Sequence, residues 1–143
     1  MTKILIVEAP YYPHIAGPLL DGATAALEKG GAQFERIFVT GALEIPPAIL
    51  FAEIAGGYDG YVALGCVIRG ETYHFEIVAG ESARGLMDLG IHKGLCIGNG
   101  ILTVENEQQA IARAAPDRGD KGGDAARACL GLVNLRQRLG FKR

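Results

Sequence analysis

The chain has 143 residues, of which 49% are hydrophobic and 21% are charged, proportions typical of a water-soluble protein with a packed core. Its 14 basic and 16 acidic residues are interspersed and give a net charge of -2, so the sequence offers no electrostatic basis for binding nucleic acid or a membrane surface. No apolar run approaches the length of a secretory signal or a membrane span, and we therefore expect one cytoplasmic domain over residues 1–143.

Apolar runs typical of strands alternate along the chain with segments of helical periodicity. The strand-like runs occupy residues 3–7, 34–39, 61–67 and 95–102. The helix-like segments occupy residues 17–29, 46–55, 75–89, 106–115 and 123–139. Four of these helices are predicted to end at glycines, at residues 30–31, 56–57, 90 and 140. Asn106 followed by Gln109 resembles a capping box and predicts the start of the fourth helix.

The alternation of strands and helices is typical of parallel βαβ construction. The strands after the first are nearly continuous apolar runs, which indicates that helices cover both faces of the sheet. The sequence thus predicts a flavodoxin-like α/β fold, a three-layer sandwich in which a four-stranded parallel sheet is flanked by helices. Cys66, Cys96 and Cys129 are widely spaced and form no paired motif, so we expect packing residues rather than disulfides or zinc ligands.

Ligands of such sheets bind beyond the carboxyl ends of the strands, where loops lead into the amino termini of helices. The loops after the first three strands are residues 8–14, 40–46 and 68–74. Each combines glycine or proline with polar or aromatic side chains. In the third, Gly70 lets a ligand approach the backbone, Thr72 can cap a helix, and His74 titrates near neutral pH. The composition leaves an ordinary alternative open, in which Thr72 simply starts the helix and His74 is a surface histidine.

Four further residues have side chains suited to binding. Glu44 holds a carboxylate at a strand end, where it accepts hydrogen bonds from hydroxyl groups or serves as a helix cap. Arg113 and Lys121 flank a polar turn and can bind phosphate, or they are solvated charges near helix ends. Tyr12 offers a ring for stacking on a flat heterocycle, or it packs in the core. These residues alone do not decide between the two roles.

Several segments together resemble the lumazine synthase family over nearly the whole chain, from Ile4 to about Leu139. The matching segments are GALEIP at residues 41–46, LGCVIRGETYH at residues 64–74, LTVEN at residues 102–106 and KG at residues 121–122. They occur in the family's order and at its spacing. Several independent motifs at consistent intervals are more specific than any one glycine pattern.

The resemblance implies a role for each candidate residue. The residues expected around the pyrimidine of the substrate and its ribityl chain are Tyr12, Ala42, Leu43, Glu44, Val67 and Ile68. Tyr12 would stack on the pyrimidine, which Val67 and Ile68 would border. Ala42 and Glu44 would meet the ribityl chain through backbone and carboxylate hydrogen bonds.

The resemblance also implies a phosphate site. The segment expected to cradle the phosphate consists of Gly70, Glu71 and Thr72. Arg113 would join it as a catalytic residue, His74 would transfer protons close by, and Lys121 would complete the pocket. Many relatives carry an aromatic residue where this chain has Asn99, at the far wall of the pocket.

The family's reaction condenses 5-amino-6-ribitylamino-uracil with 3,4-dihydroxy-2-butanone 4-phosphate to give 6,7-dimethyl-8-ribityllumazine, phosphate and water, the penultimate step of riboflavin biosynthesis. The resemblance implies neither a cofactor nor a metal. It implies a homopentamer or a multiple of pentamers with active sites between neighbouring subunits, so that Arg113 acts across an interface.

Two other functions fit the same residues. A non-catalytic lumazine or riboflavin carrier would use this pocket without turnover, and Asn99 keeps that alternative open. A flavodoxin-like domain that binds mononucleotides would need no role for His74 or Arg113.

Overall fold

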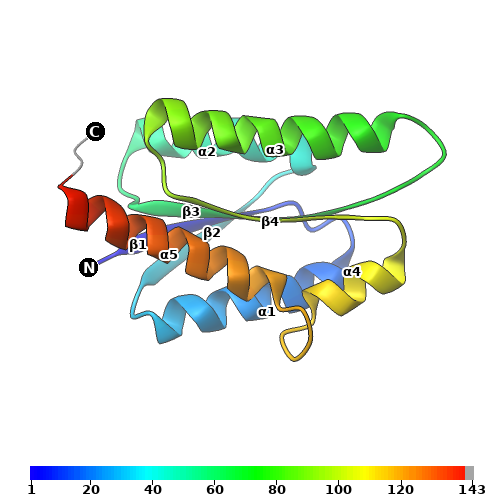
Figure 1. Ribbon diagram of the computed structural model, residues 1–143, viewed down its shortest axis with the longest axis horizontal. Helices are drawn as coiled ribbons and strands as arrows, with labels where there is room; N and C mark the ends of the chain where they lie inside the picture. Colours follow the sequence, from blue (N-terminus) through cyan, green and yellow to red (C-terminus); the bar gives the residue numbers. More distant parts are fainter. Residues whose placement is uncertain (141–143) are drawn as a thin grey trace.

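The computed structural model describes residues 1–140 and contains a parallel sheet between two layers of helices (Figure 1). The strands are β1 (Lys3–Glu8), β2 (Gln33–Phe38), β3 (Gly60–Ile68) and β4 (Ile97–Val104), in the spatial order β2-β1-β3-β4. The helices are α1 (Pro13–Lys29), α2 (Ile45–Ala55), α3 (His74–Lys93), α4 (Glu107–Ala114) and α5 (Lys121–Leu139), and a 3₁₀ turn, η1 (Ala42–Glu44), precedes α2. The predicted flavodoxin-like three-layer sandwich is confirmed, whereas residues 141–143 of the predicted domain lie outside the described residues.

The two layers of helices cover opposite faces of the sheet, α2 and α3 on one and α1, α4 and α5 on the other (Figure 1). Because side chains alternate along a strand, odd-numbered residues of β1 face α2 and even-numbered residues face α1 and α5. Leu5 packs with Tyr61 and Ile49 in the first core cluster, and Ile6 packs with Cys129 in the second. Within residues 1–140, no helix combines the length and the apolar character needed to cross a membrane.

Strand β2 lies at one edge of the sheet and is more exposed than expected. Only Phe34 of its six residues is partly buried. Its charged residues form ion pairs with β1, Glu35 with Lys3 at 3.3 Å and Arg36 with Glu8 at 2.8 Å. Charged side chains on an edge strand protect it from pairing with other chains. The expectation that helices cover both faces of every later strand is therefore wrong for β2.

Two helix boundaries differ by four residues from those expected. α1 begins at Pro13, four residues before the predicted start, because proline is favoured in the first turn of a helix, where its missing N–H leaves no bond unmade. Gly90 does not end α3, which continues to Lys93 and ends at Gly94 in the left-handed conformation. A glycine inside a helix costs only about 1 kcal/mol, which the packing of the surrounding turns offsets.

The starts of α4 and α5 are both capped by side chains. Asn106 Oδ1 accepts a hydrogen bond from the Gln109 N–H at 2.9 Å, so the predicted cap of α4 is confirmed. Asp120 Oδ1 accepts one from the Gly123 N–H at 3.3 Å, and α5 consequently begins at Lys121, two residues earlier than predicted. This start places Lys121 on a helix rather than in the preceding turn.

Gly98 allows β4 and α5 to pack backbone against backbone, since a Cβ atom at this position would lie 1.8 Å from the carbonyl oxygen of Ala125. We expect Gly98→Ala to lower the free energy of unfolding by about 3 kcal/mol, which is the upper end of the range for overpacked sites. Urea denaturation would measure this change. Gly80→Ala in α3 is the matched control because its Cβ would have no neighbour within 4 Å. It should raise stability by about 0.5–1 kcal/mol. Equal stability of the two variants would contradict this close packing.

Candidate active site

A cleft of about 430 Å³ opens where the loops after β1, β2 and β3 meet, and its size is in the range of small-molecule sites. We call it the His74 cleft. The expected substrate-binding and catalytic residues that line it are Tyr12, Ala42, Leu43, Glu44, Val67, Ile68 and His74. The lining residues that sequence reasoning missed are Ala9, Tyr11, Thr40, Gly41, Cys66 and Val78. All but Val78 lie within or beside the loops and strand ends from which the site was expected.

Local structure explains why these residues converge. β3 continues to Ile68, so that Val67 and Ile68 lie half-buried at the carboxyl end of a central strand. The η1 turn after β2 buries Ala42 and leaves Leu43 and Glu44 exposed. Glu44 is the residue before α2, but its side chain makes no capping hydrogen bond, so the alternative role of a side-chain cap is wrong. Its carboxylate lines the cleft instead, where it can accept hydrogen bonds from a polyhydroxylated ligand.

His74 is the first residue of α3 and stands at the wall of the cleft. Its backbone N–H donates a hydrogen bond to Thr72 Oγ1 at 3.3 Å. Tyr73 rather than Thr72 directly precedes the helix, but the Thr72 hydroxyl still accepts a hydrogen bond from the first N–H of α3. Gly70, Glu71 and Thr72 form an exposed loop that joins the cleft wall but does not line the cleft. An imidazole at a helix amino terminus can exchange protons with an anion held by the unpaired N–H groups.

Two neighbouring tyrosines present their rings differently. Tyr12 is half-buried and packs against the cluster that contains Ile15 and Leu19, and burial raises the pKa of its hydroxyl. Tyr11 is 73% exposed, and its ring meets that of Tyr12 edge-on at 4.9 Å between centroids. Tyr12 therefore packs in the core and also lines the cleft, whereas Tyr11 is the more exposed of the two rings.

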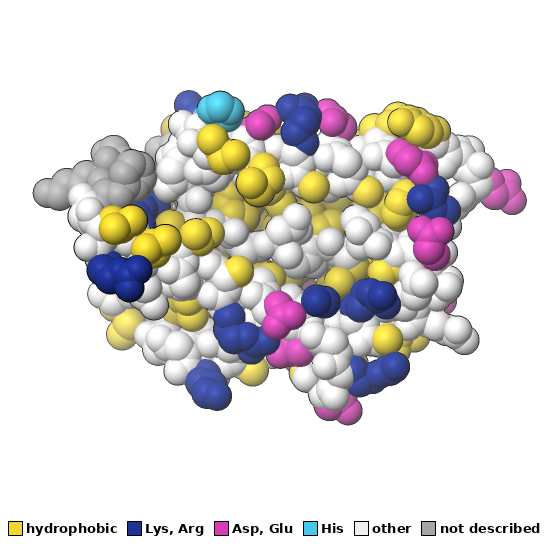
Figure 2. Space-filling view, in the orientation of Figure 1, with side chains coloured by type: hydrophobic (Ala, Val, Ile, Leu, Met, Phe, Trp, Pro, Cys, Tyr) yellow, Lys and Arg dark blue, Asp and Glu magenta, His cyan; other side chains and the backbone are white. Residues whose placement is uncertain are grey.

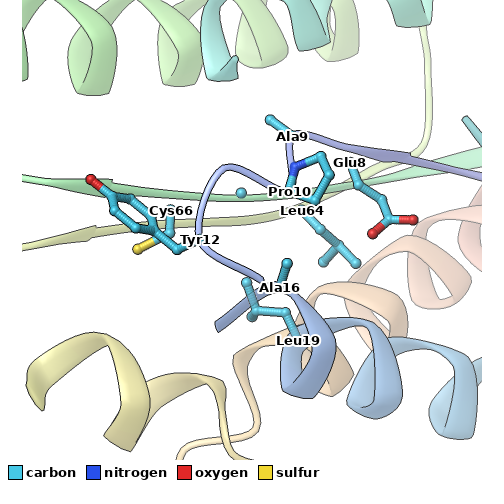
Figure 3. Close-up of a pocket in the computed structure, with 9 residues that line it drawn as sticks. Glu8, Ala9, Pro10, Tyr12, Ala16, Leu19, Leu64 and Cys66 are labelled. Carbon is cyan, nitrogen blue, oxygen red and sulfur yellow. The ribbon is translucent and has the colours of Figure 1, made fainter. Parts of the chain in front are cut away.

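Tyr12 also borders a second, smaller hollow on the α1 side of the sheet (Figure 3). Its volume of about 10 Å³ holds about one water molecule. Tyr12 and Cys66 lie beside each other there, whereas the Glu8 carboxylate points away from them (Figure 3). Glu8 accepts a hydrogen bond from Arg36 Nε at 2.8 Å. This hollow is too small for a substrate, and Glu8 belongs to a structural ion pair.

Cys66 lines both hollows and is half-buried, whereas Cys96 and Cys129 are buried as expected of packing residues. Burial raises the pKa of the Cys66 thiol to about 11, so little of the reactive thiolate exists at neutral pH. We expect the rate of its alkylation by iodoacetamide to rise about tenfold per pH unit above neutrality, because the thiolate fraction does so below the pKa.

Mass spectrometry of the peptide that contains Cys66 would measure this rate, and Cys66→Ser is the control. A rate that levels off near pH 8.5, about the pKa of an unperturbed thiol, would contradict the effect of burial.

Arg113 and Lys121 do not line the His74 cleft of the same chain. They line, with Asn99, a separate hollow of about 210 Å³ along β4, the last turn of α4 and the start of α5, which we call the Arg113 hollow. Arg113 Nη1 donates a hydrogen bond to the Gln109 carbonyl at 3.1 Å, and Asn99 Oδ1 accepts one from the Ile101 N–H at 2.9 Å. The described residues that line the hollow include two cations and no carboxylate, so it attracts anions.

A band of exposed apolar side chains runs between α3 and α5, over the outer edge of β4 (Figure 2). The residues of this apolar band are Met87, Ile91, Leu132, Leu135 and Leu139. Met87 and Ile91 are 60% and 68% exposed. In the described part of the chain, no strand pairs with the outer side of β4. Grouped exposed side chains of this kind mark an interaction surface.

The sequence profile of the family described as 6,7-dimethyl-8-ribityllumazine synthase matches residues 1–137. A relative of that name from Novosphingobium aromaticivorans is 62% identical over 138 residues, which cover 96% of this chain and 99% of the relative. A second relative of that name, from Bartonella tribocorum, is 61% identical over 141 residues, which cover 98% of this chain and 93% of the relative. The 6,7-dimethyl-8-ribityllumazine synthase 1 of Rhizobium meliloti is 58% identical over 147 aligned positions, 99% and 96% of the two chains. With this identity over nearly its whole length, and with the cleft formed by the matched segments, the chain belongs to the 6,7-dimethyl-8-ribityllumazine synthase family.

Proposed function

We propose that this protein condenses 5-amino-6-ribitylamino-uracil with 3,4-dihydroxy-2-butanone 4-phosphate to give 6,7-dimethyl-8-ribityllumazine, phosphate and water. It thereby performs the penultimate step of riboflavin biosynthesis. The observation that carries the proposal is the His74 cleft, in which a tyrosine ring, a carboxylate and an imidazole line one cavity in a chain of this family. These are the groups that a polyhydroxylated heterocycle and a proton-transfer reaction require.

The pyrimidine and its ribityl chain occupy the inner part of the cleft. The ring stacks on one tyrosine of the first loop, Tyr12 as expected from the family or the more exposed Tyr11 beside it. Val67 and Ile68 border the ring, and the ribityl hydroxyls donate hydrogen bonds to the Glu44 carboxylate. Ala42 and Leu43 contribute through the η1 backbone beside them.

The phosphate site is completed by a neighbouring copy of the chain. The His74 cleft and the Arg113 hollow share no lining residue, so one chain does not bring His74 and Arg113 together. A neighbouring copy can pack against the apolar band of the first chain. Its His74 cleft would then lie next to the Arg113 hollow of the first chain. Two different surfaces that join in this way form a ring when the rotation from one copy to the next closes on itself, and the family resemblance implies closure with five subunits or a multiple of five. We place this assembly of single-domain chains, residues 1–143, in the cytoplasm.

The chemistry needs proton transfer and anion stabilisation. The His74 imidazole accepts a proton from the reacting groups and later donates one back to them. These transfers assist formation of the imine and departure of the phosphate. Gly70, Glu71 and Thr72 surround the phosphate with backbone N–H groups near the start of α3, while Arg113 and Lys121 of the neighbouring copy offset its charge. Asn99 lies beside these two cations and forms the far wall of the pocket.

A steady-state assay with both substrates tests this function. Fluorescence of the lumazine product that rises with time supports the enzyme. Tight riboflavin binding without turnover would instead support a non-catalytic carrier, an alternative that no observation favours. Light scattering of the purified protein gives the mass of the assembly.

A further inference from the structure

The Arg69 side chain, which directly follows the cleft residue Ile68 in the chain, joins three elements of the fold. Its Nε donates hydrogen bonds to both carboxylate oxygens of Glu105, at 2.9 and 3.1 Å, just beyond the end of β4. Its Nη1 donates to the Glu76 carboxylate in the first turn of α3. The guanidinium also lies over the Phe75 ring, 4.4 Å from the ring centroid. One side chain thus connects the end of β3, the start of α3 and the loop after β4.

These contacts commit Arg69 to the protein rather than to a ligand. Two carboxylates surround one guanidinium, so the cluster of Arg69, Glu76 and Glu105 carries a net negative charge. Arg69 accordingly lowers the pKa of the Glu76 carboxyl, and the two glutamates raise the pKa of Arg69.

The position of Arg69 explains what its contacts hold in place. It directly precedes the loop of Gly70, Glu71 and Thr72, and its backbone N–H donates a hydrogen bond to the Val104 carbonyl at 2.9 Å. The chain is therefore anchored on both sides of residues 70–74, by the backbone of Arg69 at one end and by its bond to Glu76 at the other. The loop itself is exposed, and within it the Thr72 hydroxyl accepts a hydrogen bond from the His74 N–H.

We propose that Arg69 is a positioning residue that fixes the loop of residues 70–72 and the first turn of α3, and so sets where the sugar phosphate and the His74 imidazole meet. This inference rests on the proposed function for its kinetic consequences only. Exposed ion pairs add little to global stability, whereas a small displacement at a reacting site costs up to about 10²-fold in rate. Loss of Arg69 should therefore change catalysis more than folding.

The kinetic test compares Arg69→Gln and Arg69→Lys with a matched control on the same helix. The control is Arg84→Gln. Arg84 also binds two carboxylates, those of Glu81 and Asp88, but all three residues belong to α3, so their contacts connect no separate elements. We expect Arg69→Gln to raise KM for the sugar phosphate about tenfold, with KM for the pyrimidine and the midpoint of thermal unfolding nearly unchanged. Arg84→Gln should leave both constants unchanged.

Arg69→Lys separates positioning from simple attraction of the phosphate. A lysine keeps the charge, but it cannot fork between two carboxylates or stack as a planar group, so the variant should keep most of the KM defect. Glu105→Gln should shift the same constant in the same direction by a smaller factor. Full recovery in Arg69→Lys, or equal changes in both Michaelis constants, would overturn the proposal.

Hydrogen–deuterium exchange supplies a readout that does not depend on turnover. Amides of residues 70–76 should exchange several-fold faster in Arg69→Gln than in the unmodified protein or in Arg84→Gln, because the side-chain bonds to Glu76 and Glu105 are lost. Unchanged exchange in this segment would contradict the positioning role, even if the unmodified protein makes the lumazine product. Conversely, faster exchange in a protein that makes no lumazine would retain the structural role and reject the proposed function.

Discussion

Replacing His74 with alanine is expected to slow turnover by roughly tenfold to a few thousandfold, with little change in either Michaelis constant. The imidazole stands at the start of α3 on the wall of the cleft, where it can serve both imine formation and loss of phosphate. The loss should not be complete, because holding the two reactants together can by itself lower the barrier by roughly 7–11 kcal/mol. Steady-state rates of product fluorescence measure the effect.

His92→Ala is the matched control for this substitution. His92 is exposed at the other end of the same helix and does not line the cleft, so its loss should leave the rate unchanged. An unaltered rate in His74→Ala would remove this residue from the mechanism. Complete inactivity in a folded His74→Ala protein would contradict the argument from proximity.

Replacing Arg113 with alanine is expected to raise KM for the sugar phosphate by about ten- to hundredfold, since a charge-assisted contact to the phosphate is lost. KM for the pyrimidine should change little. Arg118→Ala is the control. Arg118 is exposed in the turn between α4 and α5 and does not line the Arg113 hollow, so its loss should leave both Michaelis constants unchanged. Equal effects of Arg113→Ala on both substrates would argue against a phosphate role.

Mixing the His74→Ala and Arg113→Ala chains tests whether the site is shared. If each site takes His74 from one chain and Arg113 from the next, then random reassembly of equal amounts restores about a quarter of the sites, which should show unmodified kinetics. Rates at low sugar phosphate concentration would then exceed those of either variant alone. A mixture that performs only as the average of its two parents would contradict a site between subunits.

The layers of the fold could be predicted because periodic burial leaves a direct trace in the sequence. Val62, Ala63 and Leu64 of β3 are apolar on both faces of the strand, and this requires helices above and below. The exposure of β2 depends on its place at the edge of the sheet, which linear order does not encode. Gly90 was wrongly predicted to end α3 because glycine by itself disfavours a helix. The packing of the helical turns before and after it keeps this residue helical.

The cleft could be located from the general rule that ligands bind at the carboxyl ends of parallel strands. The individual roles came instead from the resemblance to a family. Tyr11 was missed because nothing in the sequence distinguishes it from Tyr12 until the packing of Tyr12 near α1 is known. The separation of Arg113 from His74 follows from the position of β4 at the outer edge, which also requires the strand order.

The turn before α5 limits how this sequence can drift during evolution. Asp120, with φ of 49°, is the one non-glycine residue among residues 1–140 in the left-handed region. Its carboxylate oxygens lie 2.3 Å from where a Cβ at Gly22 or at Gly123 would stand. A side chain can be gained at either glycine only after position 120 has lost its carboxylate or has moved. Substitutions at Gly22 in α1 and at Asp120 in the turn are therefore coupled, even though these positions lie far apart in the chain.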